Sequence, residues 1–198
     1  MTTHRSDNPF GPGDPEQGFR CLVLQYQRRI TAFATRMLGG DAATAQDVAQ
    51  ETFLALWRQQ VRDDGRYPLP DHIDRYLLRI AHNRCLDLLR VRRDTAYLDP
   101  ERDATDSATG PEKMAQASSL GEAVRDAVSL LSEGQRSVFI LSHYDGLRYQ
   151  EIADLLDCPI GTVASRKSQA VATLRLLLKA WADHDDTDNS EKNDASQQ

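Results

Sequence analysis

Residues 149–169 read Tyr149-Gln-Glu-Ile-Ala-Asp-Leu-Leu-Asp-Cys-Pro-Ile-Gly-Thr-Val-Ala-Ser-Arg-Lys-Ser-Gln169, and this stretch decides the fold of the C-terminal half. An amphipathic helix is expected to begin at Tyr149 and to stop before Pro159, which disfavours helix in the preceding residue. A second helix is predicted to begin near Gly161-Thr162, with Thr162 as its N-cap. The small Ala153 allows the two helices to cross closely. Their shared core is expected to contain Ile152, Leu156, Ile160 and Val163.

The second predicted helix has two unlike sides. Its apolar residues recur at helical spacing and should face the core: Val163, Ala170, Val171, Leu174, Leu177 and Leu178. The other side offers Ser165, Arg166, Lys167 and Gln169. Two helices joined in this way form a helix-turn-helix, whose second helix can enter the major groove of DNA. An ordinary helical hairpin with a solvated charged face is the alternative from the pattern alone.

The charge balance is unusual for a DNA-binding chain, because the formal net charge is −6 and the pI is about 5.3. The charges are unevenly distributed, however. Residues 161–180 contain four basic residues and no acid, and residues 75–93 contain six arginines and a single acid, Asp87. Much of the negative charge lies in the C-terminal tail instead. Because local basic faces contact phosphate, DNA binding is compatible with this composition, although the chain alone should bind DNA weakly.

Motifs for other functions are absent from the sequence. It holds no GxxxxGK, GxSxG, HExxH or EF-hand pattern, so we expect no enzyme, no catalytic residue and no cofactor. Cys21, Cys85 and Cys158 are far apart, and His82 with Cys85 forms only half of a metal site, so no metal is expected. No apolar run predicts a membrane span or a signal peptide, and isolated thiols indicate a reduced, cytoplasmic chain.

The whole chain predicts an all-α fold of two small helical domains joined by a flexible linker, the C-terminal domain containing the helix-turn-helix. Further helices are predicted over residues 19–38, 42–60, 72–93, 122–131 and 133–143, with a loop over 61–71. The expected divisions are a disordered N-terminus (1–18), an N-terminal domain (19–93), a flexible acidic linker (94–119), a C-terminal domain (120–182) and an acidic disordered tail (183–198).

Two of the N-terminal helices carry distinctive faces. Residues 45–58 combine an aromatic pair with a polar face, and residues 76–90 place Asn83, Asp87 and Arg90 on one side at positions i, i+4 and i+7. Asp87 can pair with Arg84 or Arg90 and still leave arginines for phosphate. A core helix with solvated charges is the alternative for each.

With these segments the chain resembles the small bacterial RNA polymerase sigma factors of the extracytoplasmic-function (ECF) group. The resemblance rests on three segments in the family's order: residues 47–57; residues 76–90; and residues 131–175 with Gln135-Arg136-Ser137-Val138-Phe139, Glu151-Ile152-Ala153 and Gly161-Thr162-Val163. It implies a factor that binds core RNA polymerase through the β′ clamp and β subunits, directs it to promoter DNA and helps to melt the −10 region. An inhibitory anti-sigma factor is implied as a further partner.

The resemblance also implies roles for individual residues. The residues that it implies for polymerase binding are Asp47, Gln50, Phe53 and Trp57. Those that it implies for contact with the −10 element are Asn83, Arg84, Asp87 and Arg90. Tyr67, in the loop, is the candidate for stacking on a flipped base. Contact with the −35 element falls to Thr162, Ser165, Arg166, Lys167 and Gln169.

Some residues depart from the family's pattern. Tyr76 replaces a usual Trp, Ser132 a frequent Pro and Asp157 a common Gly, and Asp157 tolerates the left-handed conformation that the turn needs. Ala164, Lys167 and Gln169 replace basic, apolar and basic residues, which changes the expected −35 sequence preference.

Two other functions fit the same residues. A polymerase-independent regulator would bind specific duplex DNA alone, usually as a dimer, but no dimerisation helix is evident. An adaptor would bind only other proteins and would contact no DNA even beside the polymerase.

Overall fold

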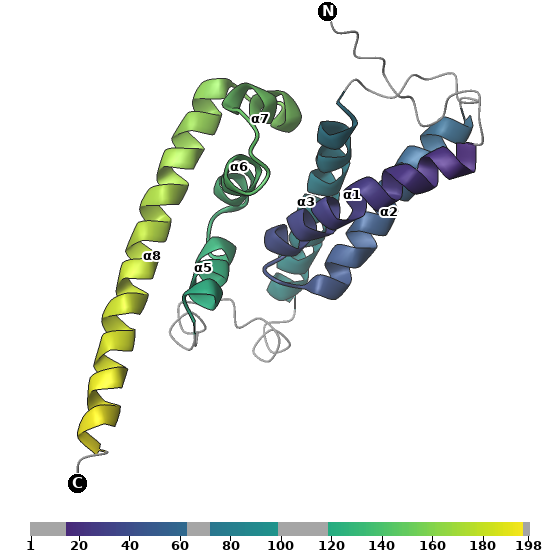
Figure 1. Ribbon diagram of the computed structural model, residues 1–198. Coiled ribbons are helices and arrows are strands. Elements are labelled where there is room, and N and C mark those ends of the chain that lie inside the picture. Colours follow the sequence, from purple (N-terminus) through teal and green to yellow (C-terminus); the bar gives the residue numbers. More distant parts are fainter. Residues whose placement is uncertain (1–14, 63–71, 99–118, 196–198) are drawn as a thin grey trace, which may run out of the picture. The chain divides into compact units, whose positions relative to one another are not determined.

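The computed structural model describes residues 15–62, 72–98 and 119–195, and all regular structure in these ranges is helical (Figure 1). This confirms the all-α prediction. The helices are α1 (Pro15–Met37), α2 (Ala42–Arg62), α3 (Ile73–Leu98), α5 (Leu120–Ser129), α6 (Glu133–His143), α7 (Tyr149–Leu156) and α8 (Ile160–Ala195). The chain divides into two compact units, Met1–Asp87 and Leu88–Gln198. None of the described helices is long and apolar enough to cross a bilayer.

In the first unit, α1 and α2 form a helical hairpin. Gly39 and Gly40 reverse the chain with φ values of +68° and +99°, a conformation that glycine adopts without strain. Asp41 then caps α2, because its Oδ1 accepts a hydrogen bond from the backbone N–H of Thr44 at 3.0 Å. The buried core of this unit includes Ile30, Phe33, Met37, Leu56 and Leu77.

Polar contacts tie α3 to the other two helices of this unit. The Nη1 of Arg29 in α1 lies 3.0 Å from the Oδ2 of Asp74 in α3. The hydroxyl of Tyr76 donates a hydrogen bond of 2.5 Å to Oε1 of Gln59 in α2. Tyr76, which stands where the family usually has Trp, therefore contributes a hydroxyl contact that an indole could not make in the same way.

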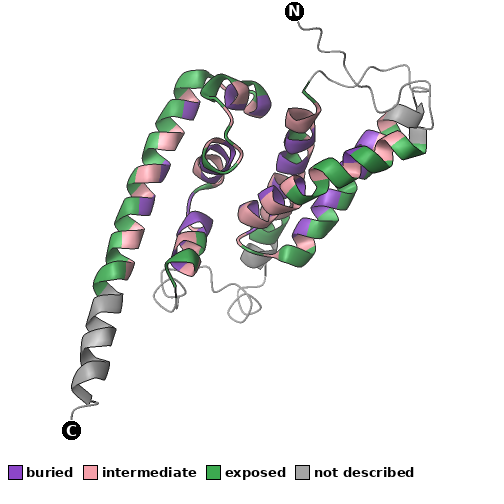
Figure 2. Cartoon of the chain, viewed as in Figure 1, coloured by how far each residue is buried: buried purple, intermediate pink, exposed green. Residues whose placement is uncertain are grey.

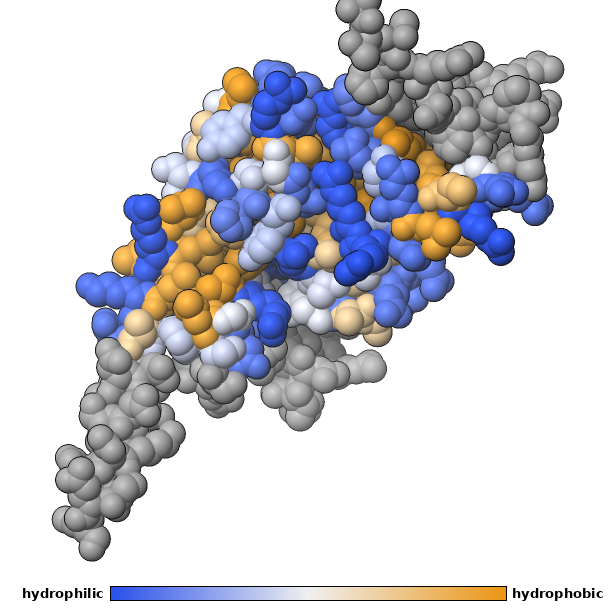
Figure 3. All heavy atoms as spheres, viewed as in Figure 1, coloured by the Kyte–Doolittle hydropathy of each residue, from blue (hydrophilic) through white to orange (hydrophobic). Residues whose placement is uncertain are grey.

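In the second unit, α6 packs against α8, and buried residues follow one side of α8 (Figure 2). Hydrophobic side chains gather on the described part of α8 and the neighbouring α5 (Figure 3). The α5–α6 connection is held by Arg136, which is buried. Its Nη2 donates hydrogen bonds to the carbonyl oxygens of Ser129 and, at 3.2 Å, of Leu131. Ser129 is the last residue of α5 and Leu131 follows it by two residues, so Arg136 satisfies carbonyls that the end of the helix leaves open.

The helix-turn-helix has the predicted turn. Helix α7 ends at Leu156, and Asp157 takes the left-handed conformation (φ +51°, ψ +52°), which confirms the prediction for this residue. The backbone N–H of Cys158 closes the turn on the carbonyl of Ala153 at 3.1 Å. An αL residue after the last helical turn is the usual way to end a helix.

The predicted start of α8 was wrong. The helix begins at Ile160, because the carbonyl of Pro159 already accepts hydrogen bonds from the N–H groups of Thr162 and Val163. Thr162 is therefore inside the first turn and is not the N-cap. The predicted core is also partly wrong, since Ile160 is 49% exposed, whereas Leu155 is buried.

Several helix ends differ from the predictions by a few residues. Helix α1 begins at Pro15, a residue suited to the first helical position, four residues before the predicted start. Helix α2 continues through residues 61 and 62, which we expected in the loop. Helix α3 runs to Leu98, into the predicted linker. Helix α5 is shifted two residues toward the N-terminus, and α6 has the predicted bounds.

Helix α8 extends past residue 182, the predicted end of the C-terminal domain, into the segment predicted as an acidic tail. Helix α8 continues to Ala195, because neither Gly nor Pro occurs after Gly161 to stop it. The remaining parts of the predicted lead-in, loop and linker (1–14, 63–71 and 99–118) lie outside the described residues, and so does Tyr67.

Candidate functional site

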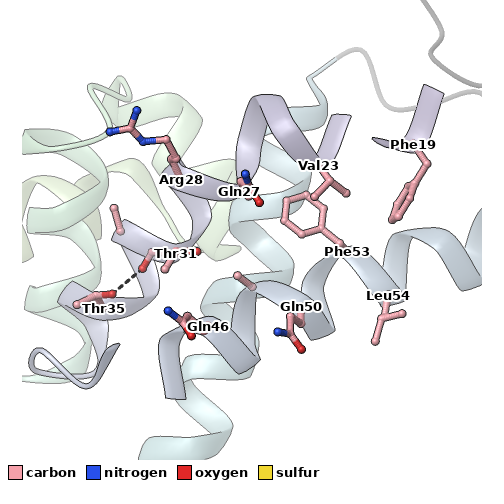
Figure 4. Close-up of a pocket in the computed structure, with 12 residues that line it drawn as sticks. Phe19, Val23, Gln27, Arg28, Thr31, Thr35, Gln46, Gln50, Phe53 and Leu54 are labelled. Carbon is pink, nitrogen blue, oxygen red and sulfur yellow. Dashed lines mark hydrogen bonds between the residues drawn. The ribbon is translucent and has the colours of Figure 1, made fainter. Parts of the chain in front are cut away.

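The first unit has an open groove of about 800 Å³ between α1 and α2 (Figure 4). Phe19 and Val23 of α1 and Phe53 of α2 form its apolar part. Gln46, Gln50, Leu54 and other residues line it from α2, and Gln27 and Arg28 are among those from α1. An apolar floor with amide groups beside it suits a protein segment that presents apolar side chains and backbone polar groups.

The four predicted polymerase-binding residues are placed differently along α2. Asp47 and Gln50 are exposed, and Gln50 lines the groove. Phe53 is 6% exposed and belongs to the core as well as to the groove. Trp57 is half-buried, and its ring lies 4.8 Å from that of Phe19. Of the four predicted residues, Asp47 and Gln50 are therefore the accessible ones, and the neighbouring Leu54, which was not predicted, is 45% exposed.

Helix α3 presents most of the predicted −10 residues on its surface. Asn83, Asp87 and Arg90 are exposed, in agreement with their helical spacing. Arg84 is half-buried and pairs with Glu51 of α2, with its Nη2 donating a hydrogen bond of 3.1 Å to Oε1. We expected Arg84 to be available to Asp87, and no local sequence signal indicates a partner 33 positions away.

The opposite side of α3 holds two buried titratable groups. Burial lowers the pKa of His82 to about 4, and a side-chain hydrogen bond with Asn83 opposes this shift. Burial raises the pKa of the Cys85 thiol to about 12. Within the described residues, no three His, Cys, Asp or Glu side chains are grouped so as to hold a metal ion.

In the helix-turn-helix, Ser165 and Gln169 lie at the surface of α8. The hydroxyl of Ser165 donates to the carbonyl of Thr162 at 3.1 Å. The Oε1 of Gln169 accepts a hydrogen bond of 3.4 Å from Nε2 of Gln135 in α6. Both side chains keep polar atoms toward solvent, where a base edge or a phosphate could be bound.

The two adjacent cations of α8 lie closer to α6 than the sequence suggested. Arg166 is half-buried and lies over Gly134, where an added Cβ would come within 3.1 Å of its Nε. Lys167 donates a hydrogen bond of 2.6 Å to Oγ of Ser142, and its Nζ lies 4.6 Å from the centroid of the Phe139 ring. Burial lowers the pKa of Lys167. Lys167 is thus placed on the side that faces α6.

Sequence reasoning missed two exposed residues at the start of α7. Arg148 and Tyr149 flank its N-terminus, and the backbone N–H of Arg148 donates to Oε2 of Glu151 at 2.8 Å. An arginine directly before the first helix of a helix-turn-helix, and a tyrosine as the first residue of that helix, were the available signal, because that helix crosses the DNA backbone.

Comparisons with known proteins place both units in one family. Residues 22–95 match the model of Sigma-70 region 2, and residues 121–174 match that of Sigma-70 region 4. The chain is 33% identical over 161 residues to the RNA polymerase sigma-H factor of Pseudomonas aeruginosa, covering 76% of this chain and 81% of that protein. It is 29% identical over 174 residues to the ECF RNA polymerase sigma factor SigW of Bacillus subtilis, covering 83% and 90%.

Solved structures agree with this result. The sigma factor RpoE in complex with the anti-sigma factor NepR from Bartonella quintana has the same fold (TM-score 0.64, 24% identity, 81% of this chain and 96% of that chain covered). CnrH in complex with the cytosolic domain of CnrY gives a TM-score of 0.58 at 27% identity, covering 88% and 94%.

Proposed function

The chain belongs to the ECF group of the sigma-70 family, and from this premise we propose how its two helical units divide the work of transcription initiation. As a sigma factor it is a DNA-binding initiation factor and not an enzyme. The function that the resemblance implied is therefore confirmed, and the independent regulator and the adaptor are not. The surfaces that bind each partner are our proposal.

The first unit supplies the polymerase contact. The groove between α1 and α2, together with the exposed Asp47, Gln50 and Leu54, binds the β′ clamp. This assignment is supported by the combination of an exposed leucine with uncharged polar groups, since Leu54 can bury apolar area that Gln50 frames with hydrogen bonds. The β subunit is the partner that we assign to the second unit.

Helix α3 supplies the −10 contact. Its exposed face of Asn83, Asp87 and Arg90 offers amide, carboxylate and guanidinium groups to a separated strand. The ion pair with Glu51 orients Arg84 beside this face. Single-stranded bases would stack on an aromatic side chain, and Tyr67 keeps that role in the proposal.

The helix-turn-helix supplies the −35 contact, and its geometry is the observation that carries the proposal. The apolar side of α8 is buried, whereas Ser165 and Gln169 are exposed on the first turns, where a second helix meets base edges. Arg166, Arg148 and the N-terminus of α7 are placed to bind backbone phosphates.

An anti-sigma factor is the proposed regulator. CnrH and RpoE were both solved in complex with a second protein, which is named as an anti-sigma factor in the RpoE structure. A regulator that covered Leu54 and Gln50 would exclude the polymerase by direct competition. Binding of this chain to core polymerase and to its regulator should then be mutually exclusive.

The polymerase contact can be tested with two exposed leucines. Leu54 lines the groove, whereas Leu24 is 63% exposed on α1 and does not line it. We expect Leu54→Ser to weaken binding to core polymerase about tenfold, since a buried leucine at an interface contributes about 1–2 kcal/mol. Leu24→Ser, the matched control, should change the affinity less than about twofold. Equal affinities of the two variants would refute the assignment of the groove.

A further inference from the structure

Lys167 is half-buried and lies on the side of α8 that packs against α6. Val163, Ala170 and Leu174 are buried, at 0%, 0% and 7% exposure, and they form a stripe at helical spacing. Lys167 stands four residues after Val163 and three before Ala170, so it completes the same stripe. The helical period alone therefore directs this side chain toward α6.

A hydrogen bond and a cation–π contact stabilise the charged ammonium of Lys167 at that position. Its ammonium donates a hydrogen bond to Oγ of Ser142 in α6 at 2.6 Å, so the side chain reaches from α8 to α6. The same ammonium lies 4.6 Å from the Phe139 ring centroid, within the range of a cation–π interaction. Such partners stabilise a partly buried ammonium, because losing water without replacing it is costly. Burial also lowers the pKa of Lys167, which agrees with this placement.

Two further contacts join α6 to the first turns of α8. Arg166 lies over Gly134, and Gln169 accepts a hydrogen bond from Gln135. Together with Lys167, three residues within one turn of α8 therefore contact α6. They would resist rotation of α8 about its own axis, and such a rotation would change which side chains point away from α6.

We propose that Lys167 is a positioning residue for recognition of the −35 element: by holding α8 against Phe139 and Ser142 of α6, it fixes the rotation of α8 that presents Ser165, Ser168 and Gln169 to the bases. The inference rests on the proposed −35 role of α8 and deepens it. Ser165, Ser168 and Gln169 are exposed and uncharged. The base contacts of this chain then depend on the placement of short neutral groups, for which a small rotation matters more than for a long charged side chain.

The test uses the full chain bound to core polymerase and a promoter fragment recovered by transcription with that holoenzyme. The −35 element is randomised, and bound sequences are selected at several salt concentrations. In Lys167→Met the stem remains and the charge is lost. We expect its preference for the favoured base over the others to fall at least about threefold, while the slope of log affinity against log salt stays unchanged. Lys167→Arg keeps a cation over Phe139 and should retain the preference within about twofold.

Ser142→Ala is a second variant that removes only the hydrogen-bond acceptor. Its effect on base preference should be smaller than that of Lys167→Met, and combining the two should add nothing further, because both break the same contact. Thermal unfolding of each variant shows whether the fold is retained.

The proposal is overturned if Lys167→Met keeps the base preference. It is also overturned if the salt slope falls by about one, because that result would make Lys167 a phosphate contact. Failure of the underlying −35 role has a different signature: the unsubstituted chain would then show no base preference in the randomised element.

Discussion

Acidification should destabilise the first unit through His82. This side chain is 7% exposed in the interior face of α3, and burial lowers its pKa from 6.5 to about 4. Above pH 6.5 both the folded and the unfolded chain keep the imidazole neutral. As the pH falls from about 6.5 to about 4, the unfolded chain binds a proton that the folded chain does not bind, so the free energy of unfolding decreases.

The size of this effect follows from the gap between the two pKa values. Each pKa unit corresponds to about 1.4 kcal/mol, so the full loss is about 3 kcal/mol, most of it developed by about pH 4.5. A domain with a stability of about 5–10 kcal/mol would lose a large part of it from this one group.

The assay is equilibrium urea unfolding between pH 7.5 and 4.5. The chain has two tryptophans, Trp57 in the first unit and Trp181 in α8. In a Trp181→Phe background, the fluorescence of Trp57 reports the first unit alone. His82→Gln removes the titrating group, so the difference in pH dependence between parent and variant isolates His82 from the carboxylates that titrate in the same range.

His72→Gln is the matched control, because His72 is exposed in the same unit. It should lose stability with the parent's pH dependence. If the parent and His82→Gln lost the same stability between pH 7.5 and 4.5, the argument that His82 is held neutral by burial would be wrong.

Three further predictions concern stability and reactivity. Arg136→Met should lower the free energy of unfolding of the second unit by about 2–4 kcal/mol in urea unfolding, because it leaves the end of α5 without its charged donor. The control Arg125→Met, at an exposed position, should lower it by less than about 0.5 kcal/mol. Equal losses in the two variants would refute the capping role. Asp157→Gly should raise the free energy of unfolding by up to about 1 kcal/mol, and with it the thermal midpoint, since glycine adopts the left-handed conformation without strain. A lowered midpoint would contradict this reason. Cys21, which is exposed, should react with a thiol reagent in the folded chain, whereas Cys85, buried and with its pKa raised to about 12, should react only as the chain unfolds.

The helix-turn-helix was predictable because its signals are local. Pro159 ends the first helix, and the apolar spacing of α8 fixes which side faces the core. The position of Thr162 was missed because the helix uses the carbonyl of Pro159 for its first hydrogen bonds, so no side-chain cap is needed.

The errors at the candidate site come from treating charge as a sign of exposure. Lys167 was assigned to the outward side by its charge, although its spacing from Val163 and Ala170 indicates the buried stripe. The acidic composition of residues 183–198 led us to predict a disordered tail, whereas the absence of Gly and Pro there is compatible with the continuation of α8. The pairing of Arg84 with Glu51 could not be predicted, because it joins two helices that only the folded unit brings together.

Transcription in vitro tests the central claim most directly, with purified core polymerase, this chain and a library of genomic fragments. The account predicts discrete transcripts that require the chain, and their aligned start regions should share two sequence elements. In Arg166→Ala, recognition of the upstream element should be lost while binding to core polymerase is retained. Transcripts that start at the same sites without the chain, or an Arg166→Ala variant with unchanged promoter occupancy, would contradict it.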